Sequence, residues 1–443
     1  MKKTSVLLAS LLLVSTNIQA QQMRSWTMDE CIQYAVEHSV GVQQSELSAA
    51  TGKAELQQAT AAFLPNISTE AGGRFNFGRN IDPETNVYNN KTSFYSDLGL
   101  YANLALFEGG KTLNTWKNAK ILRQQGLNAI QKAKDDKAIE VMQEYINVVY
   151  LDGCVKLAAD KLAESQATFR KTQLQEELGI KSNPELVQVE AQLAEDEYNL
   201  EHQKNIFNTA KLALEAAMNF TEDESFVIDT LMQTINPALS LDVPSDIIVY
   251  AEENNPIAKD AAMKTESSRL EYKLAIGNAM PKLYFGAGMN TSYIVTLNSE
   301  VPASSLNDQL KGNLGQYVGA QLSIPIFSNL SNRTNIQRNR NNYKSAQLAQ
   351  TETLRQLRTD IQQAVMDRDG YAKEILSMER KAEADSLAYS NNLRKYEEGM
   401  MSAIDLQTSG NALLLSRVTL LQKRMYYILK DRLVKYYKGE NLW

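Results

Sequence analysis

The chain has 443 residues, 43% of them hydrophobic, and a formal net charge of −6. Its mean hydropathy of −0.37 excludes a bundle of membrane-spanning helices. No long basic run is present in the sequence, which argues against nucleic acid as a partner, because phosphate contacts need clustered Lys and Arg. The length is enough for about two to three ordinary domains.

The N-terminus has the pattern of a secretory signal peptide. Lys2 and Lys3 precede an apolar run over 6–14 (VLLASLLLV), which is too short to span a bilayer, and Ala20 offers a small residue for cleavage. We therefore expect residues 1–20 to be removed. Because no cysteine follows the cleavage site, lipid attachment there is not expected.

Two segments share one pattern of apolar residues that recur every seven positions, and the second set is the first with 220 added to each number. The sets are Leu186, Leu193, Leu200, Phe207 and Leu214, then Leu406, Leu413, Leu420, Tyr427 and Val434. Preceding glycines, Gly179 and Gly399, are also 220 apart (399 − 179 = 220). An internal repeat of this length indicates a tandem of two structural units.

The first unit is expected over 21–220 and the second over 245–443, with a linking segment over 221–244. Each unit is predicted to contain a helix, a strand, a loop, a second strand, a long helix, a turn and a further helix.

The opening helix of each unit has a recognisable start or end. Thr27 followed by Glu30 resembles a helix cap with a carboxylate three residues on, and this helix is predicted to run toward Phe63. Its counterpart is predicted to begin near Pro244 and to stop before Pro281.

Four segments alternate between apolar and polar side chains, as a strand with one face of each kind does: 66–77, 94–107, 282–290 and 317–326. Their length of about ten residues is that of a tilted strand that crosses a bilayer. A soluble sheet covering a core would show the same alternation. The segments between the strands of each pair, 81–91 and 298–309, are polar and are expected to be exposed loops.

Two stretches without proline, 110–178 and 330–398, predict very long helices, each of roughly 100 Å at the usual rise per residue. The first stretch contains a 3-4-3 series that is typical of a coiled-coil seam: Ile139, Met142, Ile146 and Val149. Shorter helices are predicted over 184–219 and 402–438, which hold the sevenfold pattern.

The sequence contains no arrangement typical of catalysis or of a cofactor or metal site. His38 and His202 lie far apart and beside no cluster of ligating side chains, so we expect no metal, no cofactor and no enzyme activity. Cys31 and Cys154 lie in different predicted helices. A disulfide in an oxidising compartment and two separate thiols are both compatible with that placement.

Four strands are too few to close a membrane barrel. An open edge in lipid leaves unpaired N–H and C=O groups, each of which costs several kcal/mol. If these strands enter a membrane, several chains must therefore share one barrel, with the polar strand faces toward a wet lumen and the apolar faces toward lipid.

This plan, from Trp26 to Gly439, resembles the TolC family of outer-membrane efflux proteins. Besides the signal peptide and the repeat, the resemblance rests on two pairs of matching motifs. They are Leu104-Ala105-Leu106-Phe107 with Leu322-Ser323-Ile324-Pro325-Ile326-Phe327, and Glu177-Leu178-Gly179-Ile180 with Glu397-Glu398-Gly399-Met400.

The resemblance implies a mixed α and β membrane protein built from two tandem repeats. Three identical chains would each give four strands to a twelve-stranded β-barrel in outer-membrane lipid, continued by a long α-helical coiled-coil barrel in the periplasm. This homotrimer would be a passive exit duct for small molecules. Its partners would be a periplasmic adaptor (membrane fusion) protein and an inner-membrane pump.

The resemblance also implies that the two turns between helices contact the adaptor, through Leu178, Gly179, Ile180, Glu398, Gly399 and Met400. The two glycines are equally compatible with a purely structural role in a left-handed turn.

Four residues would form the aperture. Asp405 would contribute to an acidic ring, or would be an ordinary carboxylate of a first helical turn. The second aspartate of the family ring is Thr408 here. Tyr396 and Glu185 match positions that latch the closed aperture, but the usual arginine of that latch is Met401. We expect Met400 and Met401 to close the gap by apolar packing instead.

Two alternatives share much of this pattern. The exit channel of a type I protein secretion system has the same fold, and a secreted coiled-coil scaffold or adhesin would show the same heptads but would form soluble fibres. The transported substrate and the class of pump leave no signature in the residues.

Overall fold

A computed structural model of the chain describes residues 25–81, 86–221, 226–230, 242–299 and 302–443. The predicted signal peptide and most of the linking segment 221–244 lie outside these residues. The chain divides into two compact units. The helical unit consists of residues up to Gln44 together with 131–255 and 356–443, and the sheet unit consists of 45–130 and 256–355.

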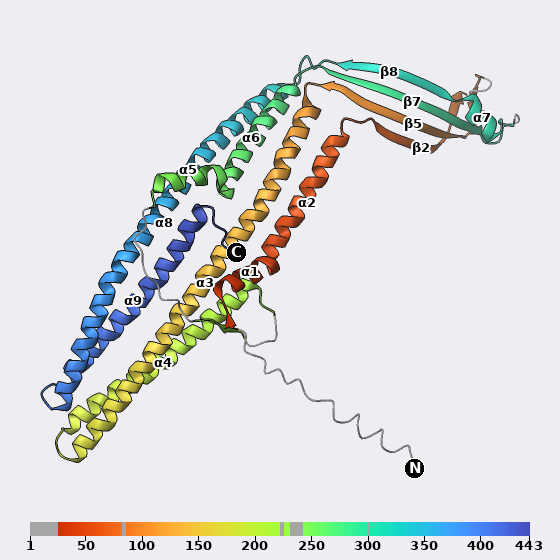
Figure 1. The fold of residues 1–443 in the computed structure, drawn as a ribbon. Helices are drawn as coiled ribbons and strands as arrows, with labels where there is room; N and C mark the ends of the chain where they lie inside the picture. The colour runs from red at the N-terminus through yellow and green to blue at the C-terminus, as the bar shows by residue number, and fades with distance from the viewer. Residues whose placement is uncertain (1–24, 82–85, 222–225, 231–241, 300–301) are drawn as a thin grey trace, which may run out of the picture. The chain divides into compact units, whose positions relative to one another are not determined.

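The sheet unit contains four antiparallel strands in the order β2-β5-β7-β8 (Figure 1). Their bounds are β2 Asn66–Asn76, β5 Ser93–Glu108, β7 Lys282–Thr296 and β8 Gly315–Ser323. All four strand predictions are confirmed in position. The predicted end of the last strand is wrong, because β8 stops at Ser323. Pro325 has no N–H to donate to a neighbouring strand, and it restricts the backbone of Ile324.

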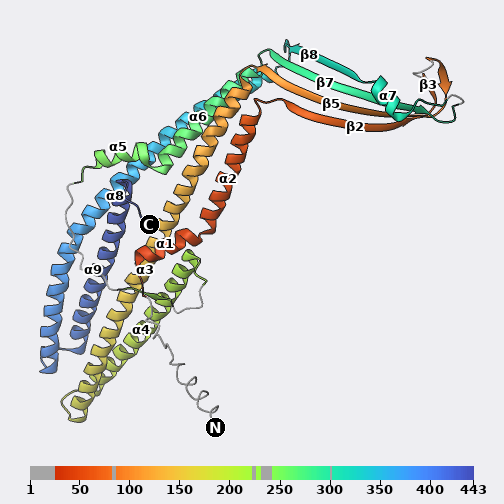
Figure 2. The same ribbon diagram turned by 45° about the vertical axis from the view of Figure 1, so that its right-hand side comes forward.

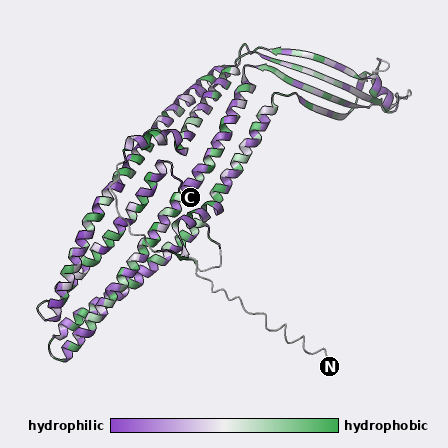
Figure 3. Ribbon diagram, in the orientation of Figure 1, coloured by the Kyte–Doolittle hydropathy of each residue, from purple (hydrophilic) through white to green (hydrophobic). Residues whose placement is uncertain are grey.

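Residues that lie opposite each other in the strand register share a face of the sheet. Ala102 pairs with Ala287, and Ala287 pairs with Val318, so the apolar positions of three strands lie on one face. The colours along the strands in Figure 3 alternate in the same way. Many apolar side chains of this face are exposed, with Ile67 at 67% and Val318 at 71%. The sheet therefore has an uncovered apolar face and a polar face.

The two segments between paired strands are more regular than predicted. A small hairpin joins β3 Arg79–Ile81 to β4 Tyr88–Asn90 in the first. In the second, the prediction of an exposed loop is wrong, because part of the segment forms the helix α7 Leu306–Gly312. This helix forms because Ser305 caps it and because the buried Gln309 side chain donates to the Ile294 carbonyl at 2.9 Å and accepts from the Ile294 N–H at 2.9 Å.

The opening helix of each half is divided in two, so the single helices predicted are wrong. In the first half, α1 Met28–His38 is followed by α2 Val40–Ala61, because Ser39 is extended (ψ 121°) and its hydroxyl accepts from the Val42 N–H. In the second, α5 Pro244–Asn254 is followed by α6 Pro256–Gly277, since a residue before proline disfavours helical geometry.

The remaining helices agree with the predictions. Both long helices have 67 residues, α3 Lys111–Glu177 and α8 Ser331–Glu397. The shorter ones are α4 Asn183–Met218 and α9 Ala403–Tyr437. Within the helical unit, α3 with α4 and α8 with α9 form two antiparallel pairs (Figure 2). The predicted cap of α1 is confirmed, since the Thr27 side chain accepts from the Glu30 N–H and the Glu30 carboxylate accepts from the Thr27 N–H.

The core of the helical unit lies among α1, α3, α4 and α9, beside a short parallel pair, β1 Ser25–Trp26 and β6 Val227–Ile228. The predicted seam of α3 is confirmed by the burial of Met142, Ile146 and Val149. Cys31 and Cys154 are both free and buried, and burial raises the pKa of the Cys31 thiol to about 12.

The sevenfold seams of α4 and α9 differ in burial. In α9 the seam is buried at Leu406, Leu413, Tyr427 and Val434, as predicted. In α4 only Leu214 of the predicted set is buried, and the more buried seam lies three residues on at Val189, Asp196 and Ala210. A heptad contains two seam positions, and the half-buried seam of α4, which includes Leu186 and Leu193, is available to other helices.

Candidate functional site

The α3–α4 turn and the α8–α9 turn are built in the same way. Gly179 and Gly399 both have φ of +73°, a left-handed conformation that favours glycine. The Gly179 N–H donates to the Glu176 carbonyl at 2.8 Å, and the Ile180 N–H donates to the Gln175 carbonyl at 2.8 Å. Gly399 and Met400 make the corresponding bonds, so each helix ends in a Schellman motif.

Each returning helix begins with a serine cap and a carboxylate three residues on. The Ser402 hydroxyl accepts from the Asp405 N–H at 3.2 Å and donates to the Asp405 carboxylate at 2.7 Å. The Glu185 carboxylate accepts from the Ser182 N–H at 3.1 Å. This backbone bond, aided by Lys181, lowers the pKa of the Glu185 carboxyl. Both predicted aperture carboxylates thus take part in helix caps, and both are accessible to solvent at least in part.

The two turns lie next to each other at one end of the helical unit, as both ribbon views show (Figures 1 and 2). Lys171 forms an ion pair with Glu397 at 3.0 Å, and the Gln175 amide donates to the Glu397 carbonyl at 3.4 Å. Apolar side chains at the turns are largely exposed: Leu178 at 67%, Ile180 at 66% and Met400 at 68%. Glu398 is exposed beside them. These residues form one apolar patch with acidic neighbours.

Tyr396 and Glu185 are brought together by a residue that the sequence did not single out. The Lys181 ammonium lies 3.2 Å from the Glu185 carboxylate and 4.2 Å from the centre of the Tyr396 ring. The Tyr396 hydroxyl is 2.9 Å from the hydroxyl of Thr172, and both residues are buried. Three helical segments therefore meet at Lys181 and Tyr396.

Met401 lies against the apolar cluster beneath the turns. That cluster contains Val189, Tyr389, Tyr396, Ala403, Leu406 and Leu413, and Met401 is half-buried against it. Asp405 lies on the exposed side of α9. The residues proposed for the aperture are thus divided, with Tyr396 and Met401 inside and Asp405 outside.

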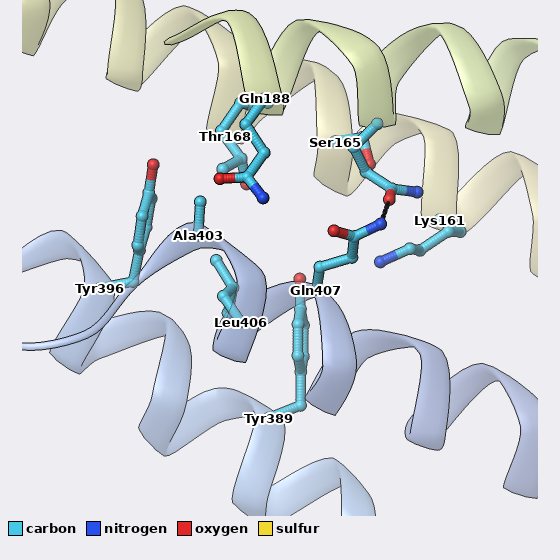
Figure 4. A pocket seen from close by; sticks show the side chains of 11 residues that line it. Lys161, Ser165, Thr168, Gln188, Tyr389, Tyr396, Ala403, Leu406 and Gln407 are labelled. Carbon is cyan, nitrogen blue, oxygen red and sulfur yellow. Dashed lines mark hydrogen bonds between the residues drawn. The ribbon is translucent and has the colours of Figure 1, made fainter. Parts of the chain in front are cut away.

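A small cavity of about 40 Å³ lies beside the cluster, between the two helix pairs (Figure 4). Its wall is partly polar. The buried Asp196 carboxylate accepts from the Ser165 hydroxyl and from the Gln192 amide, and Gln192 in turn accepts from the Gln407 amide. The cavity is large enough for a water molecule. These hydrogen bonds tie α3 and α4 to α9.

Lys181 and Thr172 could have been found from the sequence by position. Thr172 continues a sevenfold series in α3 that is buried throughout: Leu151, Ala158, Ser165 and Thr172. Lys181 lies four residues before Glu185, a spacing typical of helical ion pairs. Neither signal identifies Tyr396 as the shared neighbour, because that contact joins residues more than 200 positions apart.

The fold is similar to that of several bacterial outer-membrane proteins of known structure. A membrane protein from Pseudomonas aeruginosa is 15% identical and covers 94% of this chain and 92% of its own, with a TM-score of 0.80. The outer membrane protein VceC from Vibrio cholerae is 15% identical over 94% of this chain and 97% of its own, with a TM-score of 0.78. The Campylobacter jejuni CmeC outer membrane channel is 14% identical over 94% of this chain and 87% of its own, with a TM-score of 0.79.

The model of one family, outer membrane efflux protein, matches residues 31–219 of the chain. No curated protein matches the chain. The match over residues 31–219 and the shared fold confirm the resemblance to the TolC-type outer membrane efflux proteins that is seen in the sequence.

Proposed function

We propose that the protein is the outer-membrane exit duct of a tripartite efflux system, which passively conducts small molecules from an inner-membrane pump, through a periplasmic adaptor, to the outside. The observation that carries this proposal is the four-stranded sheet with an exposed apolar face. The family match and the structural neighbours, which include several outer membrane channels, support it.

A single copy of the sheet would expose apolar side chains in water and unpaired strand edges in lipid. Apolar side chains such as Ile67, Val318 and Leu322 are more than 60% exposed, which a soluble sheet would cover. The outer strands β2 and β8 each pair on one side only within the described chain. Their free N–H and C=O groups need partners in a bilayer, and further copies of the chain can supply them.

Three copies would give twelve strands, which is within the range of closed outer-membrane barrels. The polar sheet faces would line the lumen, and the two tandem repeats of each chain would contribute two strands apiece. The helical unit would then lie in the periplasm, with the half-buried seam of α4 against neighbouring helices.

The exposed patch at the turns suits docking of the adaptor, because Leu178, Ile180 and Met400 are apolar and accessible. The contacts of Lys181 with Glu185 and Tyr396 would hold the aperture closed, aided by the packing of Met401. Asp405, exposed at the same end, would repeat in three copies and attract cations.

Planar-bilayer recording tests the duct directly. The purified protein is expected to form stable, ion-conducting pores, and to migrate as an oligomer that heating dissociates into single chains. A protein that leaves the bilayer insulating, and that remains a single water-soluble chain, would refute the proposal and favour a soluble scaffold.

A further inference from the structure

Two tyrosines flank one glycine on the polar face of the sheet. Tyr101 of β5 lies directly opposite Gly288 of β7, and Gly288 lies directly opposite Tyr317 of β8. These three residues form a line across three strands, which we call the Tyr–Gly–Tyr row. Tyr317 is 50% exposed, and Tyr101 is half-buried.

Both rings lie over glycines. A Cβ atom at Gly288 would be 2.7 Å from Cε1 of Tyr317 and 3.0 Å from Cδ1 of Tyr101, so any other residue there would require these rings to shift. A Cβ atom at Gly99, two residues before Tyr101, would collide with the Tyr101 hydroxyl group. Glycine at these two positions therefore lets the rings lean along the sheet instead of standing upright from it. A leaning ring turns more of its π face toward the space above the sheet.

A carboxylate accompanies the row. Glu70 of β2 lies directly opposite Gly99, over which the Tyr101 ring leans, and it is exposed. Glu70 forms no ion pair within the described chain, whereas Arg74 of the same strand is paired with Asp97 at 2.7 Å. The uncompensated charge beside the rings is therefore negative. The faces of aromatic rings are also negative, so both features attract the same kind of solute.

We propose that the Tyr–Gly–Tyr row and Glu70 form a subsite for planar aromatic cations on the wall of the duct. Ring faces would stack on a flat solute, and the carboxylate would favour a positive charge on it. This inference rests on the proposed function, because it takes the polar face to line the lumen. Three copies of the chain would present the subsite three times around the duct.

Current block by added solutes tests the subsite in planar bilayers with the full-length protein. Ethidium is the probe, and tetrabutylammonium is a non-aromatic cation with the same charge. We expect ethidium to block wild-type pores at a concentration about tenfold lower than tetrabutylammonium does, because only ethidium has a flat ring system that can stack on the two tyrosine rings. The double variant Tyr101→Leu, Tyr317→Leu is expected to lose this difference, and Glu70→Gln is expected to weaken block by both cations.

Control variants separate ring chemistry from folding. Tyr101→Phe with Tyr317→Phe keeps both rings and is expected to keep the preference for ethidium. Tyr293 pairs with Ser96 and lies on the apolar face, opposite to the row. Tyr293→Leu is therefore expected to leave the preference for ethidium unchanged. Equal block of wild-type pores by the two cations, or an unchanged preference in the double leucine variant, would overturn the subsite. A wild-type protein that forms no pore would refute the duct itself, so the two failures are distinguishable.

Discussion

Replacing Lys181 by methionine is expected to weaken the contacts that we propose hold the aperture closed. The side chain is only 6% exposed, and its ammonium contacts both the Glu185 carboxylate and the Tyr396 ring. An ion pair at this spacing is worth about 0.3–0.5 kcal/mol, and a largely buried cation–π contact is worth about 1 kcal/mol. Methionine retains much of the apolar stem, so packing is largely preserved.

The two contributions sum to about 1.5 kcal/mol, which is about a tenfold change in an equilibrium constant. If these contacts exist only in the closed form, the open probability of single pores should rise by about that factor. Single-channel recording at constant voltage measures it.

Lys204→Met is the matched control for Lys181→Met. Lys204 lies on α4 and pairs with Glu201 at 2.6 Å, but the two side chains are 46% and 67% exposed. An exposed pair of this kind contributes little, so gating should not change. An open probability that is the same in Lys181→Met, Lys204→Met and wild-type pores would refute a latch at Lys181.

Three further outcomes are expected. Tyr396→Phe and Thr172→Val each remove a buried hydroxyl contact and should lower the free energy of unfolding by about 1–2 kcal/mol. In denaturant titrations the double variant should lose less than the sum of the two single losses, because both variants remove the same hydrogen bond. Additive losses would contradict a hydrogen bond between the two hydroxyls. Gly109→Ala should reduce the yield of folded protein, because φ is +62° and a Cβ would collide with the end of α6, whereas Gly370→Ala, with open space around it, should be tolerated. The pKa of Glu185 is lowered in the folded protein, so the ionised carboxylate stabilises the fold above its ordinary pKa of about 4.3, and this stabilisation is lost as pH falls through the folded pKa. The free energy of unfolding of Glu185→Gln, measured against pH, should lack this loss. Identical pH dependence in the variant and the wild type would count against the prediction.

Much of the fold could be predicted because its signals are local and periodic. The positions of α3, α8 and the four strands follow from the absence of proline and from alternation, which reflect backbone chemistry within a few residues, but the ends of β7 and β8 do not. The breaks at Ser39 and Asn255 were missed although Pro256 follows the second. A helical pattern continues on both sides of each break, so periodicity alone does not reveal it.

The candidate site was predicted only in part. Glycine turns with capped returning helices are encoded locally, so Gly179, Gly399 and the carboxylates Glu185 and Asp405 could be located from the sequence. The meeting of Lys181 with Tyr396 depends on how separate helices pack, and no single-sequence pattern reports that. The same holds for the placement of Asp196 beside Ser165 and Gln192.

The pairing of β2 of one chain with β8 of another is the central claim, and disulfide cross-linking tests it most directly. Within one chain these strands are separated by β5 and β7, which is about 14 Å at the usual strand spacing, and a disulfide needs Cα atoms within about 7 Å. Ser68→Cys in β2 is combined in turn with Gly319→Cys and Gln321→Cys in β8, all on the polar face. The expected result is a covalent ladder that ends at three chains for at least one combination. Single chains in every combination, from a protein that stays in aqueous solution, would contradict the shared barrel.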